Sequence, residues 1–453
     1  MFFSPANHLV ETGRLATPVL FGLIPGMEIK TLWMPPAYLL YSSSLIHLFS
    51  DSLTVVRLGS SIAIYFSLVC LYFLTKSFGF SKKASIIVFS SIILEPLLFR
   101  FGSAARMEGL TALFFLMSLL FVSSETTKNK RMLFCLFGGV CLSLSCLSHP
   151  FGASLGIITL FLLFYKNQNW KLCLIFFGIG GILPILVWVY YIYPDFDLFI
   201  LQFGSQLVRK KTLFQNFSLY DKLRVFLFGF AFAKFRLIVI GIQIFLLSIL
   251  SFRFYSKEKS LPKNLQIYWV WVITVLFSLY SSSEGWYVIH SLFPLVWGMG
   301  LIYDNLPKFK VVVWVGLLIS LSGIFQFTYI HWYKTDSNLI LKNHFEKIEQ
   351  ILQNSKSVYL QALPDPYFYL RTKRPNLTIR EFIPGELGIP SEVFLKTIHS
   401  IDAFVFYNDD LRNSAIKDLL KDNSVWSREE WDIPVPTNHW LHYKTIVYTK
   451  TKN

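Results

Sequence analysis

Apolar residues in this chain gather in long uninterrupted runs, and short polar segments separate one run from the next. Each run between residues 57 and 330 is about long enough to cross a hydrocarbon core of ~30 Å, which takes roughly 17–25 helical residues. The pattern therefore predicts an α-helical polytopic membrane protein with about ten transmembrane helices. The predicted spans are 57–75, 84–99, 108–124, 132–148, 151–165, 172–193, 236–252, 265–282, 286–303 and 310–330.

Composition agrees with this class. The chain of 453 residues is 54% hydrophobic and only 15% charged, which excludes an ordinary soluble domain. In a soluble protein, a net charge of +15 would indicate a nucleic-acid partner. Here no nucleic-acid motif accompanies it, so we expect membrane lipids as the partner of the loop cations and no nucleic acid. The five cysteines all fall in predicted spans without metal-ligand spacing, so no cofactor is indicated, although a divalent cation stays open.

Positive charge alternates between the short loops. The basic loop residues Lys76, Lys82, Lys83, Lys128, Lys130, Arg131, Lys166, Lys171, Arg253, Lys257, Lys259, Lys263, Lys308 and Lys310 fall on one side. The opposite short loops carry Arg100 and Arg106. By the positive-inside rule the first set is cytoplasmic, and both termini are then predicted to be extracytoplasmic.

An external N-terminus needs an export signal, and residues 1–33 hold no basic region followed by an apolar stretch. We therefore expect one further transmembrane helix upstream of Met1. In the alternative interpretation, the 35–49 stretch itself spans the membrane.

The chain is expected to divide into three parts. Residues 1–56 form an extracytoplasmic loop with juxtamembrane helices, 57–330 form the membrane body with an external loop at 194–235, and 331–453 form a small extracytoplasmic α/β domain. The pattern of that domain predicts helices near 337–354 and 410–421 and strands at 357–360, 402–407 and 445–448.

Several short motifs follow one another in a characteristic order. They are Leu9-Val10-Glu11-Thr12-Gly13, Trp33-Met34-Pro35-Pro36-Ala37-Tyr38, Arg57-Leu58-Gly59-Ser60-Ser61, Arg106-Met107-Glu108 and Ser148-His149-Pro150-Phe151-Gly152. This order resembles the GT-C superfamily of membrane glycosyltransferases over about residues 4–300. The likeness is greatest to bacterial relatives of protein O-mannosyltransferases, to lipid A aminoarabinose transferase (glycosyltransferase family 39-like) and to lipopolysaccharide core galacturonosyltransferases.

The resemblance implies a hexosyl- or pentosyltransferase in the bacterial cytoplasmic (inner) membrane. Such an enzyme moves a sugar from a polyprenyl-phosphate-linked donor to an envelope glycan, lipid or protein acceptor on the outer face. The family's catalytic acidic pair would align just before Met1, and the nearest carboxylates, Glu11 and Glu28, do not occupy its position. Activity of the chain as it stands is therefore left open. The alternative function is a transporter or flippase of lipid-linked saccharides, which would place charges deep within several helices.

Glu108 and Arg106 are the predicted catalytic residues. Glu108 corresponds to the family's second acidic position, and Arg106 would contact phosphate or orient Glu108. A charged pair at a membrane helix end is a functional candidate by default, and the alternative is a structural helix-end ion pair. Glu95, beside Pro96 in the outer part of a span, is a weaker substrate-binding candidate.

The predicted substrate-binding residues are Arg209, Lys210, Lys211, His149, Glu284, Trp286 and Tyr287. The 209–211 cations suit a lipid phosphate, with plain headgroup binding as the alternative. His149 would bind phosphate or donate a proton, or it serves only to start a helix. The 284–287 turn would contact the acceptor or stack on a sugar, or its aromatic residues anchor the membrane interface.

Overall fold

The computed structural model describes the chain in two compact units. The helical unit comprises Pro35–Pro194 and Phe217–Gln326, and the mixed unit comprises Met1–Met34, Asp195–Asn216 and Phe327–Asn453. The division of the chain into three consecutive parts stays a prediction. The described residues are 3–102, 104–124, 127–166, 169–214, 218, 233–281, 285–328, 337–361, 365–381, 392–407, 414–435 and 443–451.

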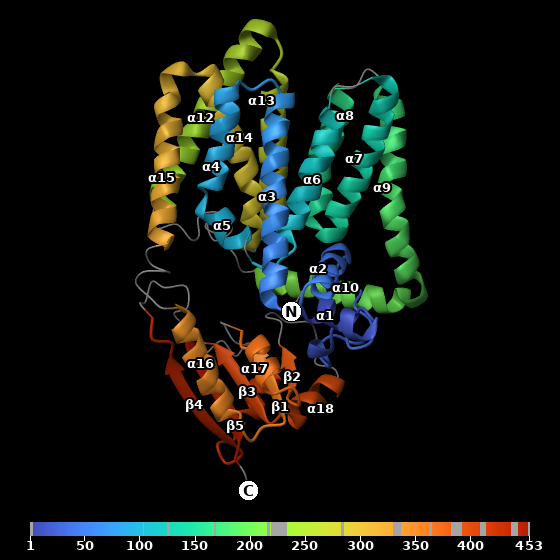
Figure 1. Cartoon of the computed structure of the whole chain (residues 1–453), viewed down its shortest axis with the longest axis vertical. Coiled ribbons are helices and arrows are strands. Elements are labelled where there is room, and N and C mark those ends of the chain that lie inside the picture. The colour runs from blue at the N-terminus through green and yellow to red at the C-terminus, as the bar shows by residue number, and fades with distance from the viewer. Residues whose placement is uncertain are drawn as a thin grey trace. The chain divides into compact units, whose positions relative to one another are not determined.

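Within the described residues, each predicted span consists mainly of helix. The helices of this unit are α2 (Ala37–Leu48), α3 (Leu53–Ser77), α4 (Lys82–Ile93), α5 (Pro96–Gly102), α6 (Glu108–Ser123), α7 (Lys128–Ser148), α8 (Phe151–Lys166), α9 (Trp170–Ile192), α12 (Ala233–Glu258), α13 (Lys263–Ser281), α14 (Ile289–Asn305) and α15 (Lys310–Thr328), with short 3₁₀ turns η3 (Gly285–Val288) and η4 (Pro307–Phe309) (Figure 1). Among the described residues, five helices are long and apolar enough to cross a membrane. The polytopic membrane class is thus confirmed, while the number of ten spans stays a prediction.

Two expectations about these segments are corrected. The predicted span 84–99 is two helices, α4 and α5, because Pro96 lacks an N–H donor and disfavours helical geometry at Glu95. The 194–235 segment was expected to be a loop, but Phe196–Phe214 forms helix α10, in which Phe199 stacks on Phe203 one turn later with ring centres 5.5 Å apart. Residues 219–232 lie outside the described chain.

The alternative span at 35–49 does not hold either. The helix there, α2, has only 12 residues, which correspond to a length of about 18 Å. It packs along α3 instead, where Tyr41 donates a hydrogen bond to the carbonyl of Gly59 at 2.8 Å.

Glycines permit the close crossing of α7 and α9. A Cβ atom at Gly139 would lie 2.0 Å from the carbonyl oxygen of Phe177, and one at Gly180 would lie 2.0 Å from that of Leu136. Small residues at such crossings let membrane helices approach through their backbones. Neither position leaves room for a side chain.

We therefore expect Gly139→Ala to lower the free energy of unfolding by about 1–3 kcal/mol or more, because the two helix backbones must separate. The matched control is Gly178→Ala in α9, where a new Cβ would meet nothing within 4 Å. Thermal unfolding of the purified protein in detergent compares them. Equal melting temperatures for the two variants would contradict this account of the crossing.

The mixed unit is built on a five-stranded sheet with the order β2-β1-β3-β5-β4. The strands β1 (Ser357–Gln361), β2 (Thr378–Glu381) and β3 (Ala403–Tyr407) are parallel, whereas β5 (Lys444–Lys450) and β4 (Trp426–Asp432) add in antiparallel fashion. The helices of this unit are α1 (Phe3–Thr12), α10, α16 (Ser337–Ile351), α17 (Tyr367–Lys373), α18 (Glu392–Ser400) and α19 (Ser414–Leu419), with the 3₁₀ turn η1 (Pro18–Leu20). The expected α/β pattern is present, and β2 and β4 are strands that the sequence pattern did not predict.

The N-terminal segment packs against this sheet unit. Phe3 meets Phe368 with ring centres 4.3 Å apart, and Glu11 forms an ion pair with Arg371. Arg380 of β2 donates a hydrogen bond to the carbonyl of Pro18 at 2.9 Å. Residues far apart in the chain thereby form one folded body.

Candidate active site

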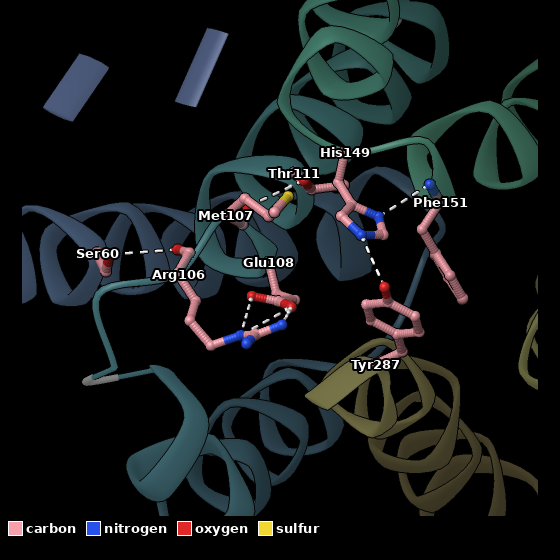
Figure 2. A network of polar contacts seen from close by, with 8 residues as sticks. All are labelled: Ser60, Arg106, Met107, Glu108, Thr111, His149, Phe151 and Tyr287. Carbon is pink, nitrogen blue, oxygen red and sulfur yellow. Dashed lines mark hydrogen bonds and ion pairs between the residues drawn. The ribbon is translucent and has the colours of Figure 1, made fainter. Parts of the chain in front are cut away.

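The start of α6 is held tightly against α3. Gly109 permits this approach, since a Cβ there would lie 3.1 Å from the carbonyl oxygen of Ser60. The Ser60 hydroxyl donates to the carbonyl of Arg106 at 3.3 Å, and the Thr111 hydroxyl donates to that of Met107 at 2.9 Å (Figure 2). These contacts fix the backbone that leads into Glu108.

Arg106 and Glu108 form a forked ion pair. Arg106 Nη2 lies 2.7 Å from Glu108 Oε1, and Arg106 Nε lies 3.1 Å from both carboxylate oxygens (Figure 2). The Glu108 side chain is only 3% exposed and that of Arg106 is 18% exposed. A carboxylate so far from water needs such a partner. The pair holds a proton acceptor and a cation side by side, within one turn of a helix end.

His149 lies between α7 and α8 and is oriented by two hydrogen bonds. The Phe151 N–H donates to His149 Nδ1 at 3.0 Å, and His149 Nε2 lies 3.1 Å from the Tyr287 hydroxyl oxygen (Figure 2). Because Nδ1 accepts, the neutral ring carries its proton on Nε2 and donates it to Tyr287. In this tautomer the Tyr287 hydroxyl oxygen is the acceptor of that hydrogen bond.

His290 completes this cluster. It stacks on Phe151 with ring centres 4.5 Å apart and planes 13° apart. It is buried, and its Nε2 makes no hydrogen bond to any residue that the structure describes. Electrostatic interactions link Glu108 to both His149 and His290. The predicted residues Arg106, Glu108, His149 and Tyr287 are thus brought together, and His290 joins a site for which it was not selected.

Two of the other predicted substrate-binding residues are described with their side chains. Arg209 and Lys211 belong to α10 of the mixed unit, where Arg209 Nε donates to Gln206 Oε1 at 2.9 Å and Lys211 is exposed. The side chain of Lys210, residue Glu284 and the side chain of Trp286 lie outside the described parts of the chain, although the backbone of Trp286 is in η3.

The N-terminal carboxylates Glu11 and Glu28 have partners of their own. Glu11 is paired with Arg371, and Glu28 interacts electrostatically with Arg380. No group of three or more His, Cys, Asp or Glu side chains within the described ranges is arranged to hold a metal ion.

Comparison with solved structures shows a GT-C-like fold. Among solved structures, the chain is similar to ArnT from Cupriavidus metallidurans bound to undecaprenyl phosphate, with a TM-score of 0.55 and 10% identity over 99% of this chain and 92% of that one. The apo form of ArnT gives a TM-score of 0.55 and 11% identity over 98% and 92%.

The archaeal oligosaccharyltransferase AglB from Archaeoglobus fulgidus, in complex with an inhibitory peptide and a dolichol-phosphate, is a more remote likeness. It has a TM-score of 0.49 and 12% identity over 90% of this chain and 65% of that one. No family model matches the chain, and no curated protein matches it. The fold predicted from the order of motifs is therefore confirmed by structure, at a level of identity at which sequence comparison finds nothing.

Proposed function

We propose that this protein is a glycosyltransferase that moves a sugar from a polyprenyl-phosphate-linked donor to an envelope glycan, lipid or protein acceptor. The observation that carries the proposal is the buried Arg106–Glu108 pair beside His149 and Tyr287 in a GT-C fold. Such a transferase needs a base for the acceptor, a cation or donor for the leaving phosphate, and a water-poor site.

Each group has a role in this reaction. Glu108 accepts the proton of the acceptor hydroxyl as the acceptor oxygen attacks the anomeric carbon of the sugar. The bond between that carbon and the phosphate oxygen breaks, and the electron pair leaves with the lipid phosphate. Arg106 and the Tyr287 hydroxyl stabilise the negative charge that develops there, with His149 orienting Tyr287. His290 lies close enough to interact with the same carboxylate.

We propose separately that the basic end of α10 binds a lipid phosphate. Arg209, Lys210 and Lys211 supply positive charge, and the hydrogen bond from Arg209 to Gln206 orients the guanidinium. The 284–287 segment, with Glu284, Trp286 and Tyr287, is proposed to bind acceptor or sugar.

The proposed setting is the bacterial cytoplasmic membrane, with the site facing outward. In the helical unit, Lys76 and Lys82 belong to the turn between α3 and α4, and Glu108 is the first residue of α6. The label of α5, the helix that precedes α6, lies toward the opposite end of α3 from this turn (Figure 1). By the positive-inside rule the Glu108 end faces the exterior, together with both termini of this chain.

Binding of undecaprenyl phosphate to the purified protein tests the lipid contact. Arg209→Gln is expected to raise the dissociation constant about tenfold, because it removes a charge-assisted hydrogen bond. Lys342→Gln, which removes an exposed cation of α16, is the control and should change little. If the two variants bind undecaprenyl phosphate equally well, Arg209 does not bind the lipid phosphate specifically and contacts only membrane headgroups.

A further inference from the structure

Helix α10 presents an apolar face that the rest of the chain leaves exposed. The large side chains on this face are between 46% and 57% exposed, and they are Phe196, Ile200, Leu201, Leu207 and Val208. At 3.6 residues per turn, these five positions fall within a sector of about 140° around the helix axis. Gly204 lies in the same sector, and a Cβ atom there would meet nothing within 4 Å. An exposed apolar face of this kind is typical of a surface that a membrane or a partner covers.

The opposite side of α10 is polar and is already occupied. Gln202 is fully buried there, and its Oε1 accepts a hydrogen bond from the Leu32 N–H at 2.8 Å. Its Nε2 donates to the carbonyls of Lys30 at 2.9 Å and Pro25 at 3.2 Å. A helix on a water-exposed surface usually shows the reverse arrangement, with its apolar side toward the protein core. The outward side of α10 is therefore suited to an apolar environment.

The preceding helix places the start of α10 at the level of a membrane surface. Helix α9 has 23 residues, and its length of about 34 Å suffices to cross a hydrocarbon core. Tyr190 and Tyr193, at its end, are 83% and 78% exposed, and tyrosines in such positions typically lie at the interface between membrane and water. The 3₁₀ turn η2 (Tyr193–Asp195), which contains Pro194, then ends α9, and α10 begins directly after it.

The charged groups on the exposed face lie at its two ends. Asp197 is in the first turn of α10 and Lys211 is in its last turn, and both are exposed. All residues of this sector between them are apolar. A protein partner typically makes about one hydrogen bond per 100–200 Å² of interface, whereas lipid acyl chains need none. A lysine at the helix end can extend its ammonium group to the lipid phosphates. The composition of the face thus favours a phospholipid surface over a protein.

We propose that α10 lies in the plane of the membrane surface, with its exposed apolar face among the acyl chains of phospholipids and Lys211 near their phosphates. Residues 25–32, which Gln202 holds on the opposite side of the helix, are then carried at the membrane surface. This membrane contact does not depend on transferase activity.

Spin labels on α10 test this orientation in the full chain, reconstituted in vesicles of phosphatidylethanolamine and phosphatidylglycerol. A nitroxide is attached to Ile200→Cys or to Leu207→Cys. Its accessibility to oxygen, which concentrates among acyl chains, is compared with its accessibility to a water-soluble nickel chelate. We expect both labels to lie about 5–10 Å into the boundary between headgroups and acyl chains, the usual depth of an interfacial helix. The unsubstituted protein, whose five cysteines are buried or half-buried, gives the background signal.

The control is Lys342→Cys on α16, where the native side chain is 65% exposed. Its label should be more accessible to the chelate than to oxygen, as for a helix in water. Access of the chelate to both α10 labels, as at the control position, would overturn the assignment. Shielding of both labels from oxygen and chelate alike would also overturn it, since a protein surface would then cover the face. Insertion of only one label would exclude a helix parallel to the membrane plane.

Discussion

Glu108→Gln is expected to reduce sugar transfer by about 10²–10⁴-fold, because a positioned acid–base group contributes that much to a reaction. The amide keeps the shape of the carboxylate and remains a hydrogen-bond acceptor for Arg106, so the variant should fold and insert. It cannot accept the acceptor's proton at neutral pH. The loss should therefore appear in the turnover number far more than in the affinity for the donor.

The measurement is turnover of a lipid-linked donor by wild type and variant at equal amounts of folded protein. Glu346→Gln, the exposed carboxylate of α16, is the control and should retain full turnover. If Glu108→Gln turns over like that control, Glu108 is only the structural partner of Arg106.

Arg106→Gln is expected to lower the free energy of unfolding by about 3–5 kcal/mol, the usual consequence of leaving a buried charge without its partner. Glu108, at 3% exposure, would then keep its negative charge in a region with little water. Transfer activity should fall as well, because the cation beside the leaving phosphate is lost.

The double variant Arg106→Gln, Glu108→Gln separates the two effects. Removal of both charges should restore most of the lost stability, as judged by the unfolding midpoint in detergent, while activity stays low. Additive destabilisation by the two substitutions would show that the forked contact between these side chains does not exist in solution.

The helices were predictable from the sequence because apolar length alone decides whether a segment can span a bilayer. The positions at which the helices are broken were harder to predict from the sequence. Pro96 signals a possible break, but whether the chain continues as one bent helix or as α4 and α5 depends on what packs around Glu95. Similarly, β4 is an edge strand with mostly exposed polar residues, so it carries no alternating apolar pattern to recognise.

The candidate site also contains contacts that the sequence predicts and contacts that depend on packing. Arg106 and Glu108 are two positions apart, so their pairing follows from local sequence. His149 and Tyr287 are separated by 138 residues, and only packing of α7, α8 and η3 brings them into contact. His290 was not selected, since a single histidine at the start of an apolar helix has no distinguishing pattern before its stacking on Phe151 is known.

The central claim is that this chain transfers a sugar from a lipid phosphate and does not merely move the intact lipid-linked saccharide across the membrane. Protein reconstituted in vesicles with a radiolabelled polyprenyl-phosphate-linked sugar and an external acceptor extract distinguishes the two most directly. The account predicts that label passes to the acceptor, that free polyprenyl phosphate is released in equal amount, and that Glu108→Gln abolishes both. Movement of the intact labelled lipid to the other leaflet, without release of polyprenyl phosphate and unaffected by Glu108→Gln, would contradict it.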